Sequence, residues 1–332
     1  MIAEELAENV FAIDAPFEDV PLQVYVVRGD PVTVIDPGVA QVPERHLVTG
    51  LAEIGLRLSD VDLIVNTHGH HDHRGGNGVV RAHNPDVSVA AHRSDAHWIA
   101  DTERYIEEQY LSLAPMWTPT EGFLERIRSL CGEDVPVDRF LADEDEIDLG
   151  GGQRLLVKHV PAHTSGHVVL FHEPGKVLFT GDSLQARGTP LWRRSSFFPS
   201  YQSVREYQRS LDFFAECGAQ VVGTAHNEVC KPHRAAQLVG ESRRFVDEIT
   251  DFLAHQLQES GVLTVPDAVR AVSAHWPRFG VGSQLFMTVC AHLQLLADGG
   301  SARYSGDPDT GFEWAGSPRT NGSGTAEPGK EG

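Results

Sequence analysis

Four potential metal ligands lie close together in the segment Thr67-His-Gly-His-His-Asp-His73, directly after an apolar run. His68, His70, Asp72 and His73 occupy positions i, i+2, i+4 and i+5. This spacing does not follow one helix face, where neighbours recur at i and i+4. It suits a loop whose alternate side chains converge on one point, and imidazole and carboxylate are ligands that Zn²⁺ takes. A run of solvated surface histidines is the alternative, but the pattern arises by chance in roughly one such chain in several hundred.

Three further residues with ligand side chains follow along the chain, each directly after an apolar segment that we expect to form a strand. They are His163, Asp182 and His226. Each alone is more often structural than a ligand, because a single loop histidine can serve many purposes. Together with the first cluster they give four groups of donors at strand ends, which indicates a metal site.

The order His-x-His-x-Asp-His, His, Asp, His resembles that of the metallo-β-lactamase-fold hydrolases, over roughly residues 8–232, and their glyoxalase II-like and thioesterase-like branch in particular. The resemblance implies an α+β fold, an αββα sandwich of two sheets between layers of helices. It also implies two Zn²⁺ ions, with iron or manganese as alternatives. The implied ligands are His68, His70 and His163 for the first ion, Asp72, His73 and His226 for the second, and Asp182 as the bridge between them.

The resemblance implies a mechanism as well. Two such ions lie about 3.5–4 Å apart and share a water, whose pKa they lower until hydroxide is available near neutral pH. This bridging hydroxide would attack a carbonyl or phosphorus centre, with Asp72 and Asp182 as the catalytic carboxylates. No serine or cysteine nucleophile is then required.

Four residues near these ligands carry separate expectations. Asp36 and His167 match positions that orient the ligands of similar proteins through hydrogen bonds. His71 stands at a variable position of the motif, so we expect it to point away from the metals. Asn227 stands where similar enzymes have glycine after the last histidine, and asparagine is the next-best residue for a left-handed backbone.

The elements that must position these residues alternate between strands and helices in two halves, which predicts two packed sheets covered by helices. We expect a helix near 43–54, a helical segment from 95 to about 128 and a strand over 139–149. This metal-binding domain is predicted to span residues 1–235.

The chain after residue 235 is predicted to be a helical domain, 236–316, followed by a disordered Gly/Ser/Pro-rich tail, 317–332. Three helices, at 241–259, from Thr264 and at 283–297, precede two short strands, so this unit resembles a small winged-helix extension. Its natural recognition helix contains no lysine or arginine, so we expect no DNA binding. A wall of the substrate cleft, an oligomer contact such as a homodimer interface, and a purely structural role remain alternatives.

Composition narrows the class of protein. The net charge of −20 argues against a protein that grips a phosphate backbone. The sequence has no run of eighteen apolar residues, so we expect no membrane span. The acidic N-terminus does not look like a signal peptide. The four cysteines are scattered without a CxxC pair, which fits reduced thiols in a cytoplasm.

Two stretches could shape the substrate pocket. The aromatic-rich segment 95–128 is long enough to form a cap, although its aromatics could simply be core. The segment 184–201 follows Asp182, and in it we expect Arg187, Trp192, Arg193, Arg194 and Tyr201 to contact the substrate, although a solvated loop anchored by aromatics is equally consistent. Arginine forks would suit an anionic handle on a small-molecule substrate.

We therefore expect a hydrolase of esters or thioesters, such as an acyl thioester or a lactone. A metal-dependent nuclease or phosphodiesterase is the alternative, since the same metals serve phosphorus chemistry. An iron-dependent redox enzyme, similar to sulfur dioxygenases, is a second alternative.

Overall fold

The computed structural model describes residues 2–192, 196–304 and 312–314. Two β-sheets form the centre of the first part of the chain. The first sheet has seven strands in the order β1-β2-β3-β4-β5-β6-β7. Its strands are β1 (Ala3–Ala7), β2 (Val10–Asp14), β3 (Gln23–Val27), β4 (Thr33–Ile35), β5 (Leu63–Val65), β6 (Ser88–His92) and β7 (Arg139–Leu141). Strands β4 to β7 run parallel to one another.

The second sheet has five strands in the order β14-β11-β10-β9-β8. They are β8 (Glu146–Asp148), β9 (Arg154–His159), β10 (Val168–His172), β11 (Val177–Phe179) and β14 (Val221–Gly223). The two sheets pack face to face, because side chains of both, such as Tyr25, Ile35, Leu170 and Phe179, share one buried core. A further pair, β12 (Thr189–Pro190) and β13 (Ser196–Phe197), lies in the segment after Asp182.

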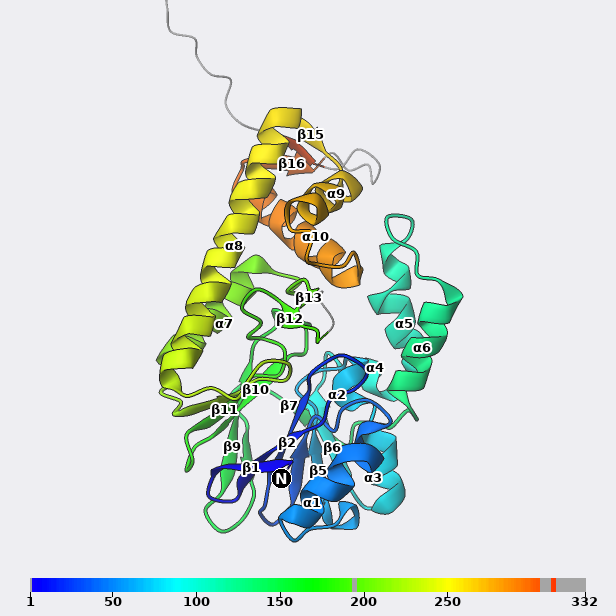
Figure 1. The fold of residues 1–332 in the computed structure, drawn as a ribbon, viewed down its shortest axis with the longest axis vertical. Helices are drawn as coiled ribbons and strands as arrows, with labels where there is room; N and C mark the ends of the chain where they lie inside the picture. Colours follow the sequence, from blue (N-terminus) through cyan, green and yellow to red (C-terminus); the bar gives the residue numbers. More distant parts are fainter. Residues whose placement is uncertain (1, 193–195, 305–311, 315–332) are drawn as a thin grey trace, which may run out of the picture.

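Helices cover the outer face of each sheet, which completes the αββα order (Figure 1). On the first sheet, α1 (Val48–Glu53) and α3 (Asn77–His83) bury Leu51 and Val80 against strand residues such as Val34. On the second sheet, α7 (Val204–Glu216) and α8 (Pro232–Ser260) bury Leu211 and Leu238 in a separate core. The α+β sandwich expected from the sequence is therefore confirmed.

One strand prediction was wrong. The segment 139–149 is not a single strand, because β7 belongs to the first sheet and β8 to the second. The chain changes sheets in the turn between them. There Glu144 adopts a positive φ of 67°, and the carboxylate of Asp145 accepts a hydrogen bond from the amide of Ala142 at 2.8 Å. An acidic turn of this kind ends one strand before the next begins.

The aromatic-rich segment forms a helical lobe beside the sandwich. It contains α4 (Ala96–Ala100), α5 (Thr102–Gln109) and α6 (Glu121–Cys131). Its own core includes Trp98, Tyr105, Tyr110 and Leu124. The buried guanidinium of Arg74, in α2 (His71–Arg74), donates to the hydroxyl of Thr102 at 3.1 Å and so ties this lobe to the helical turn next to the histidine cluster.

The C-terminal unit consists of α9 (Val265–His275), α10 (Ser283–Asp298) and a three-stranded sheet of β15 (Val262–Leu263), β17 (Phe312–Trp314) and β16 (Ala302–Tyr304). Thr264 caps α9 by accepting a hydrogen bond from the amide of Asp267, as the sequence predicts. Helix α8 is longer than predicted. Its 29 residues run from the sandwich into this unit without a break, and residue 235, the expected domain boundary, lies inside it. Leu238 packs in the core of the sandwich and Leu253 in that of the C-terminal unit.

In the described part of the chain, no helix combines the length and the apolar character needed to cross a membrane. The predicted tail, 317–332, lies outside the described residues.

Candidate metal centre

The loops after four strands meet at one edge of the two sheets. The segment after β5 carries His68 and His70 and then forms the single helical turn α2, which begins at His71. From the second sheet, His163 follows β9, Asp182 follows β11 and His226 follows β14. Parallel strands present their carboxyl ends on one side, which explains why donors so far apart in the sequence come together.

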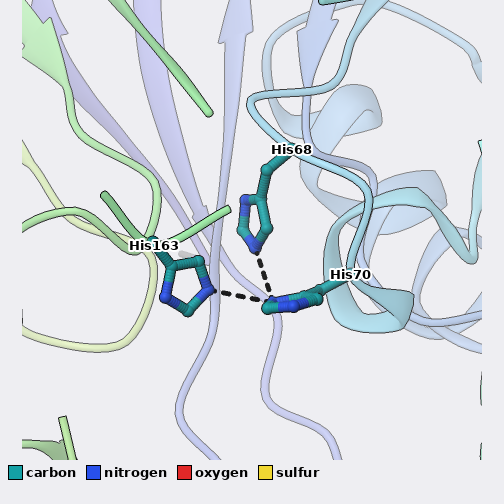
Figure 2. Close-up of side chains that lie close together, drawn as sticks. All are labelled: His68, His70 and His163. Atoms are coloured by element: carbon teal, nitrogen blue, oxygen red, sulfur yellow. Dashed lines mark hydrogen bonds between the residues drawn. The ribbon is translucent and has the colours of Figure 1, made fainter. Parts of the chain in front are cut away.

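Three histidine nitrogens face one another in the first group (Figure 2). Nε2 of His68 lies 3.1 Å from Nδ1 of His70, and Nε2 of His163 lies 2.9 Å from the same atom. Figure 2 shows His68 and His70 on one segment and His163 approaching from another. All three side chains are buried.

A second group lies beside the first. Nε2 of His226 lies 3.3 Å from the carboxylate of Asp72 and 3.3 Å from that of Asp182. Asp182 also lies 3.4 Å from Nε2 of His73 and 3.6 Å from Nε2 of His163. Asp182 therefore contacts histidines of both groups.

In three of these histidines, His73, His163 and His226, the other ring nitrogen has its own acceptor. Nδ1 of His73 donates to Asp36 at 2.9 Å, and Nδ1 of His163 donates to the carbonyl of Ser200 at 2.7 Å. Nδ1 of His226 donates to the carbonyl of Pro21 at 2.7 Å. Such partners fix the tautomer and leave the lone pair of Nε2 directed into the site.

The geometry of the site suits bound cations. Nitrogen lone pairs that face one another at hydrogen-bond distance can share only a few protons, and an ion between them relieves this crowding. Nε2 of His73 and one carboxylate oxygen of Asp182 are buried without any hydrogen-bond partner among the described residues. Three sets of donor atoms lie within 4.8 Å of one another: His68, His70 and His163; His68, His73 and Asp182; and Asp72, His73 and His226. These residues fit metal ions.

The protonation states of the site also suit a bound cation. Burial lowers the pKa of His68 and of His70 well below the usual value, so both rings are neutral, as metal ligands must be. Burial also disfavours charge on His226, but the carboxylates of Asp182 and Asp72 outweigh it and raise its pKa to about 10. In the absence of metal, this histidine is protonated at neutral pH because the two carboxylates attract positive charge.

Asp36 and His167 lie next to these histidines. Asp36, besides binding His73, accepts hydrogen bonds from the amide and the hydroxyl of Thr67 at 2.7 and 2.6 Å. The ring of His167 stacks on that of His68, with centroids 4.6 Å apart, and its Nε2 donates to the carbonyl of Thr180 at 3.0 Å. Both residues are placed to orient ligands.

Of two neighbours of the cluster, His71 matches the expectation and Asn227 does not. His71 does point away from the groups above, since its Nδ1 bonds the hydroxyl of Tyr105 at 3.1 Å, but it lines the cavity that the metal centre faces. Asn227 does not adopt a positive φ. Its amide instead donates to the hydroxyl of Thr224 at 3.0 Å, so this loop does not need a left-handed residue.

A cavity of about 270 Å³ lies over the metal centre. Its floor contains His70, Asp72, His163, Asp182 and His226. Its walls come from four separate parts of the chain: the loop with Phe17 and Val20, the helical lobe, the segment 185–200, and residues 280–284 around the start of α10. The wall residues of the lobe include Tyr105, Tyr110, Trp117, Phe123 and Arg126, and α10 contributes Ser283 and Gln284.

Most of the residues predicted to bind substrate are not brought to this cavity. Arg187 donates to both carboxylate oxygens of Glu248, at 3.0 and 2.8 Å, and its guanidinium lies 4.1 Å from the centroid of the Phe245 ring. Tyr201 is fully buried, and its hydroxyl bonds His292 at 2.8 Å. Trp192 is 61% exposed and does not line the cavity. Arg193 and Arg194 lie outside the described residues.

Arg126 lines the cavity but was not predicted to bind substrate. It stands on α6 and donates to the carboxylate of Glu18. The sequence offered one signal for it, because it falls within the segment expected to form a cap.

Asp95 was also missed, although it connects two ligand loops. Its buried carboxylate accepts hydrogen bonds from the amide of Gly69 at 2.9 Å, the amide of Gly166 at 2.7 Å and the hydroxyl of Thr164 at 2.6 Å. A Cβ at Gly166 would lie 2.5 Å from this carboxylate, so only glycine permits the approach. Nothing in the sequence distinguishes Asp95 from an exposed helix cap.

Gln185 has a similar role after Asp182. Its side-chain amide donates to the carbonyl of Ser200 at 3.2 Å, and its oxygen accepts from the amide of Ser200 at 2.7 Å. The same amide group donates to the carbonyl of Asp182 at 2.5 Å. Gln185 thus holds the Asp182 loop against the carbonyl that orients His163.

The sequence is similar to proteins of a known family. The model of the metallo-beta-lactamase superfamily matches residues 19–226. The probable metallo-hydrolase YqjP of Bacillus subtilis is 28% identical over 252 residues, which are 71% of this chain and 76% of that protein. The human acyl-coenzyme A thioesterase MBLAC2 is 31% identical over 189 residues, 54% of this chain and 64% of that protein.

A hydroxyacylglutathione hydrolase of Photobacterium profundum is 25% identical over 242 residues, 71% of this chain and 73% of that protein. Among solved structures, the metallo-beta-lactamase family protein TTHA1429 of Thermus thermophilus superposes with a TM-score of 0.74 at 23% identity. That match covers 93% of this chain and 100% of the other, so the C-terminal unit is part of the shared fold.

Proposed function

Since the chain belongs to the metallo-beta-lactamase superfamily, we propose that it is a dinuclear zinc hydrolase that cleaves an ester or thioester bond, such as that of an acyl thioester or a lactone. The observation that carries the proposal is the position of Asp182, which contacts His163 of one donor group and His73 and His226 of the other. His68, His70 and His163 would hold the first ion, and Asp72, His73 and His226 the second, with Asp182 between them.

Two ions held in this way would supply hydroxide near neutral pH and would stabilise negative charge on the attacked group. The residues of the chain fix the geometry for this chemistry. Asp36 and the carbonyls of Ser200 and Pro21 hold the ligand histidines in one tautomer. Asp95 holds the His68–His70 loop against the loop of His163, so the donors are positioned before substrate arrives.

The cavity walls favour an acyl substrate. Trp117, Phe123 and Phe198 give them an apolar and aromatic character, which suits an acyl group rather than a sugar–phosphate backbone. Two of the relatives support the same choice by name, one as an acyl-coenzyme A thioesterase and one as a hydroxyacylglutathione hydrolase. Arg126 is a cation in the lining that could bind an anionic part of such a substrate.

The test is a metal analysis together with a hydrolysis screen of acyl-coenzyme A thioesters, lactones and bis-aryl phosphodiesters. We expect about two zinc ions per chain, thioester or lactone hydrolysis, and loss of that activity with a chelator. One iron and no zinc would overturn the dinuclear zinc centre. A clear preference for phosphodiesters would overturn the substrate class and favour the phosphodiesterase alternative.

A further inference from the structure

The helical lobe and the C-terminal unit meet above the metal cavity. Leu113, Met116 and Trp117 of the lobe pack against the hydrophobic core of the C-terminal unit. The side-chain amide of Gln109, at the end of α5, lies 3.4 Å from the sulfur of Met287 on α10. In Figure 1 the two parts face each other over the loops that carry the ligands. Two segments far apart in the sequence therefore contact each other and together cover the metal cavity.

An open groove of about 460 Å³ lies at this junction. Six of its lining residues are apolar: Met116 from the lobe, and Pro266, Val269, Ala274, Val281 and Phe286 from the C-terminal unit. Arg270 and Ser273 are the polar residues of the lining, and Arg270 is paired with Asp267 of the same helix. The groove is therefore an apolar surface that no described residue covers.

The groove and the metal cavity adjoin at Val281. Val281 lines both, and Met116 and Trp117 are consecutive residues of which the first lines the groove and the second the cavity. Val281 is 56% exposed and stands between Gly280 and Gly282, which also line the cavity. An exposed apolar side chain at the border of two cavities favours an apolar ligand that crosses from one to the other.

The small volume of the metal cavity also favours a ligand that extends into the groove. Its volume of about 270 Å³ is below the roughly 300–1,000 Å³ of pockets that enclose whole ligands. A substrate whose reacting carbonyl lies at the metal centre must extend beyond the cavity if it carries a chain of many carbons. The groove behind Val281 offers that chain a surface on which its methylene groups leave water.

We propose that this groove binds the acyl chain of the substrate, so that the enzyme prefers medium- to long-chain acyl esters or thioesters over short ones. The proposal rests on the function proposed above. Each methylene group buried in the groove should raise kcat/KM by roughly threefold to fourfold, the factor that corresponds to its transfer from water. The increase should end when the chain outgrows the groove.

The experiment measures the ratio of kcat/KM for dodecanoyl-coenzyme A to that for butanoyl-coenzyme A. Two substitutions change exposed lining residues and should leave the fold intact: Ala274→Trp fills the groove, and Val281→Asp puts a charge at its border. Val262→Asp, at an exposed apolar residue of β15, and Ala100→Trp, at an exposed residue of α4, line neither cavity and are the matched controls.

We expect a ratio well above ten for the native chain, a fall of at least tenfold in both groove variants, and no change in the controls. A native ratio near one, or a high ratio that both groove variants retain, would overturn the groove assignment while leaving the hydrolase function in place. If the groove variants changed the oligomeric state and not the ratio, the groove would bind a second copy of the chain. If no ester or thioester of any length were cleaved, the proposed function would fail, and the groove assignment with it.

Discussion

The carboxylate of Asp36 accepts a hydrogen bond from Nδ1 of His73 at 2.9 Å, while it also binds the amide and hydroxyl of Thr67. One buried acid thus fixes the ring of a ligand histidine and the start of the loop that carries two others. Residues of this kind act on a metal centre without touching the ion.

Asp36→Asn should lower the affinity for the ion that His73 would hold, with only a small effect on the free energy of unfolding. We expect a loss of about 10- to 100-fold in metal affinity, the usual effect of removing such a partner. Competition with a chelator of known affinity measures it, and Asp14→Asn, which changes an acid bonded to Gln23 at the protein surface, is the control. Unchanged affinity in Asp36→Asn would show that Asp36 only supports the loop.

Asp182→Asn should cost far more activity than His71→Ala, although both residues line the cavity. Asp182 contacts both donor groups, so its loss should lower kcat/KM by about 1,000-fold or more, the scale of several kcal/mol of charge stabilisation. His71 is bonded to Tyr105 instead, and its loss should cost less than about tenfold. Equal losses would mean that the ligand assignment is wrong.

Asp95→Asn should destabilise the protein because an amide has one oxygen for the three donors that Asp95 now satisfies. At least one buried donor is then left without a partner, at a cost of about 1–3 kcal/mol. Denaturant unfolding of the metal-free protein measures this loss. An additional fall in metal content at equal zinc supply would confirm that Asp95 positions the ligand loops. A variant as stable as the native protein would contradict this role.

Arg187→Ala should affect stability and Arg126→Ala should affect substrate binding, because of these two arginines only Arg126 lines the cavity. The first removes an ion pair with Glu248 that is partly exposed, so unfolding should become easier by at most about 1 kcal/mol, with KM unchanged. The second should raise KM for an anionic acyl thioester by about tenfold, which corresponds to about 1.5 kcal/mol. A small neutral ester is the control substrate. If Arg187→Ala alone raised KM for the thioester, the prediction would be reversed.

His292 should make the protein less stable as the pH falls. It is buried between the hydroxyls of Tyr201 and Thr250, at 2.8 Å from each, and burial lowers its pKa to about 3. An unfolded histidine titrates near 6.5, so below that pH the unfolded chain takes up a proton that the folded chain refuses. Stability is then complete above about pH 6.5 and is lost progressively toward pH 3, by at most about 1.4 kcal/mol per pH unit.

Denaturant unfolding of the native chain and of His292→Gln between pH 7 and pH 5 tests this. The variant should be less stable at pH 7 but should show a shallower dependence on pH. Parallel pH profiles for the two proteins would show that His292 contributes nothing to acid sensitivity.

The sequence alone predicted the sandwich and the candidate ligands that the structure brings together. Metal binding requires particular side chains at short and characteristic spacings, so His68, His70, Asp72 and His73 could be recognised from residue type and spacing alone. The alternation of apolar segments and helical patterns likewise predicted two sheets between helices, and the capping residue Thr264 marked the start of α9. These are local properties, which the order of residues expresses directly.

Only the tertiary structure decided what surrounds the metal centre. Arg187 was expected at the substrate, but its partner is Glu248, 61 residues away, and an ion pair of this range leaves no local pattern. Asp95 contacts Gly69 and Gly166, which are 26 and 71 residues away. The cavity and its groove form where the lobe and the start of α10 meet. Contacts of this kind depend on how the helices and loops pack, and packing combines distant segments whose sequences do not indicate which of them will touch.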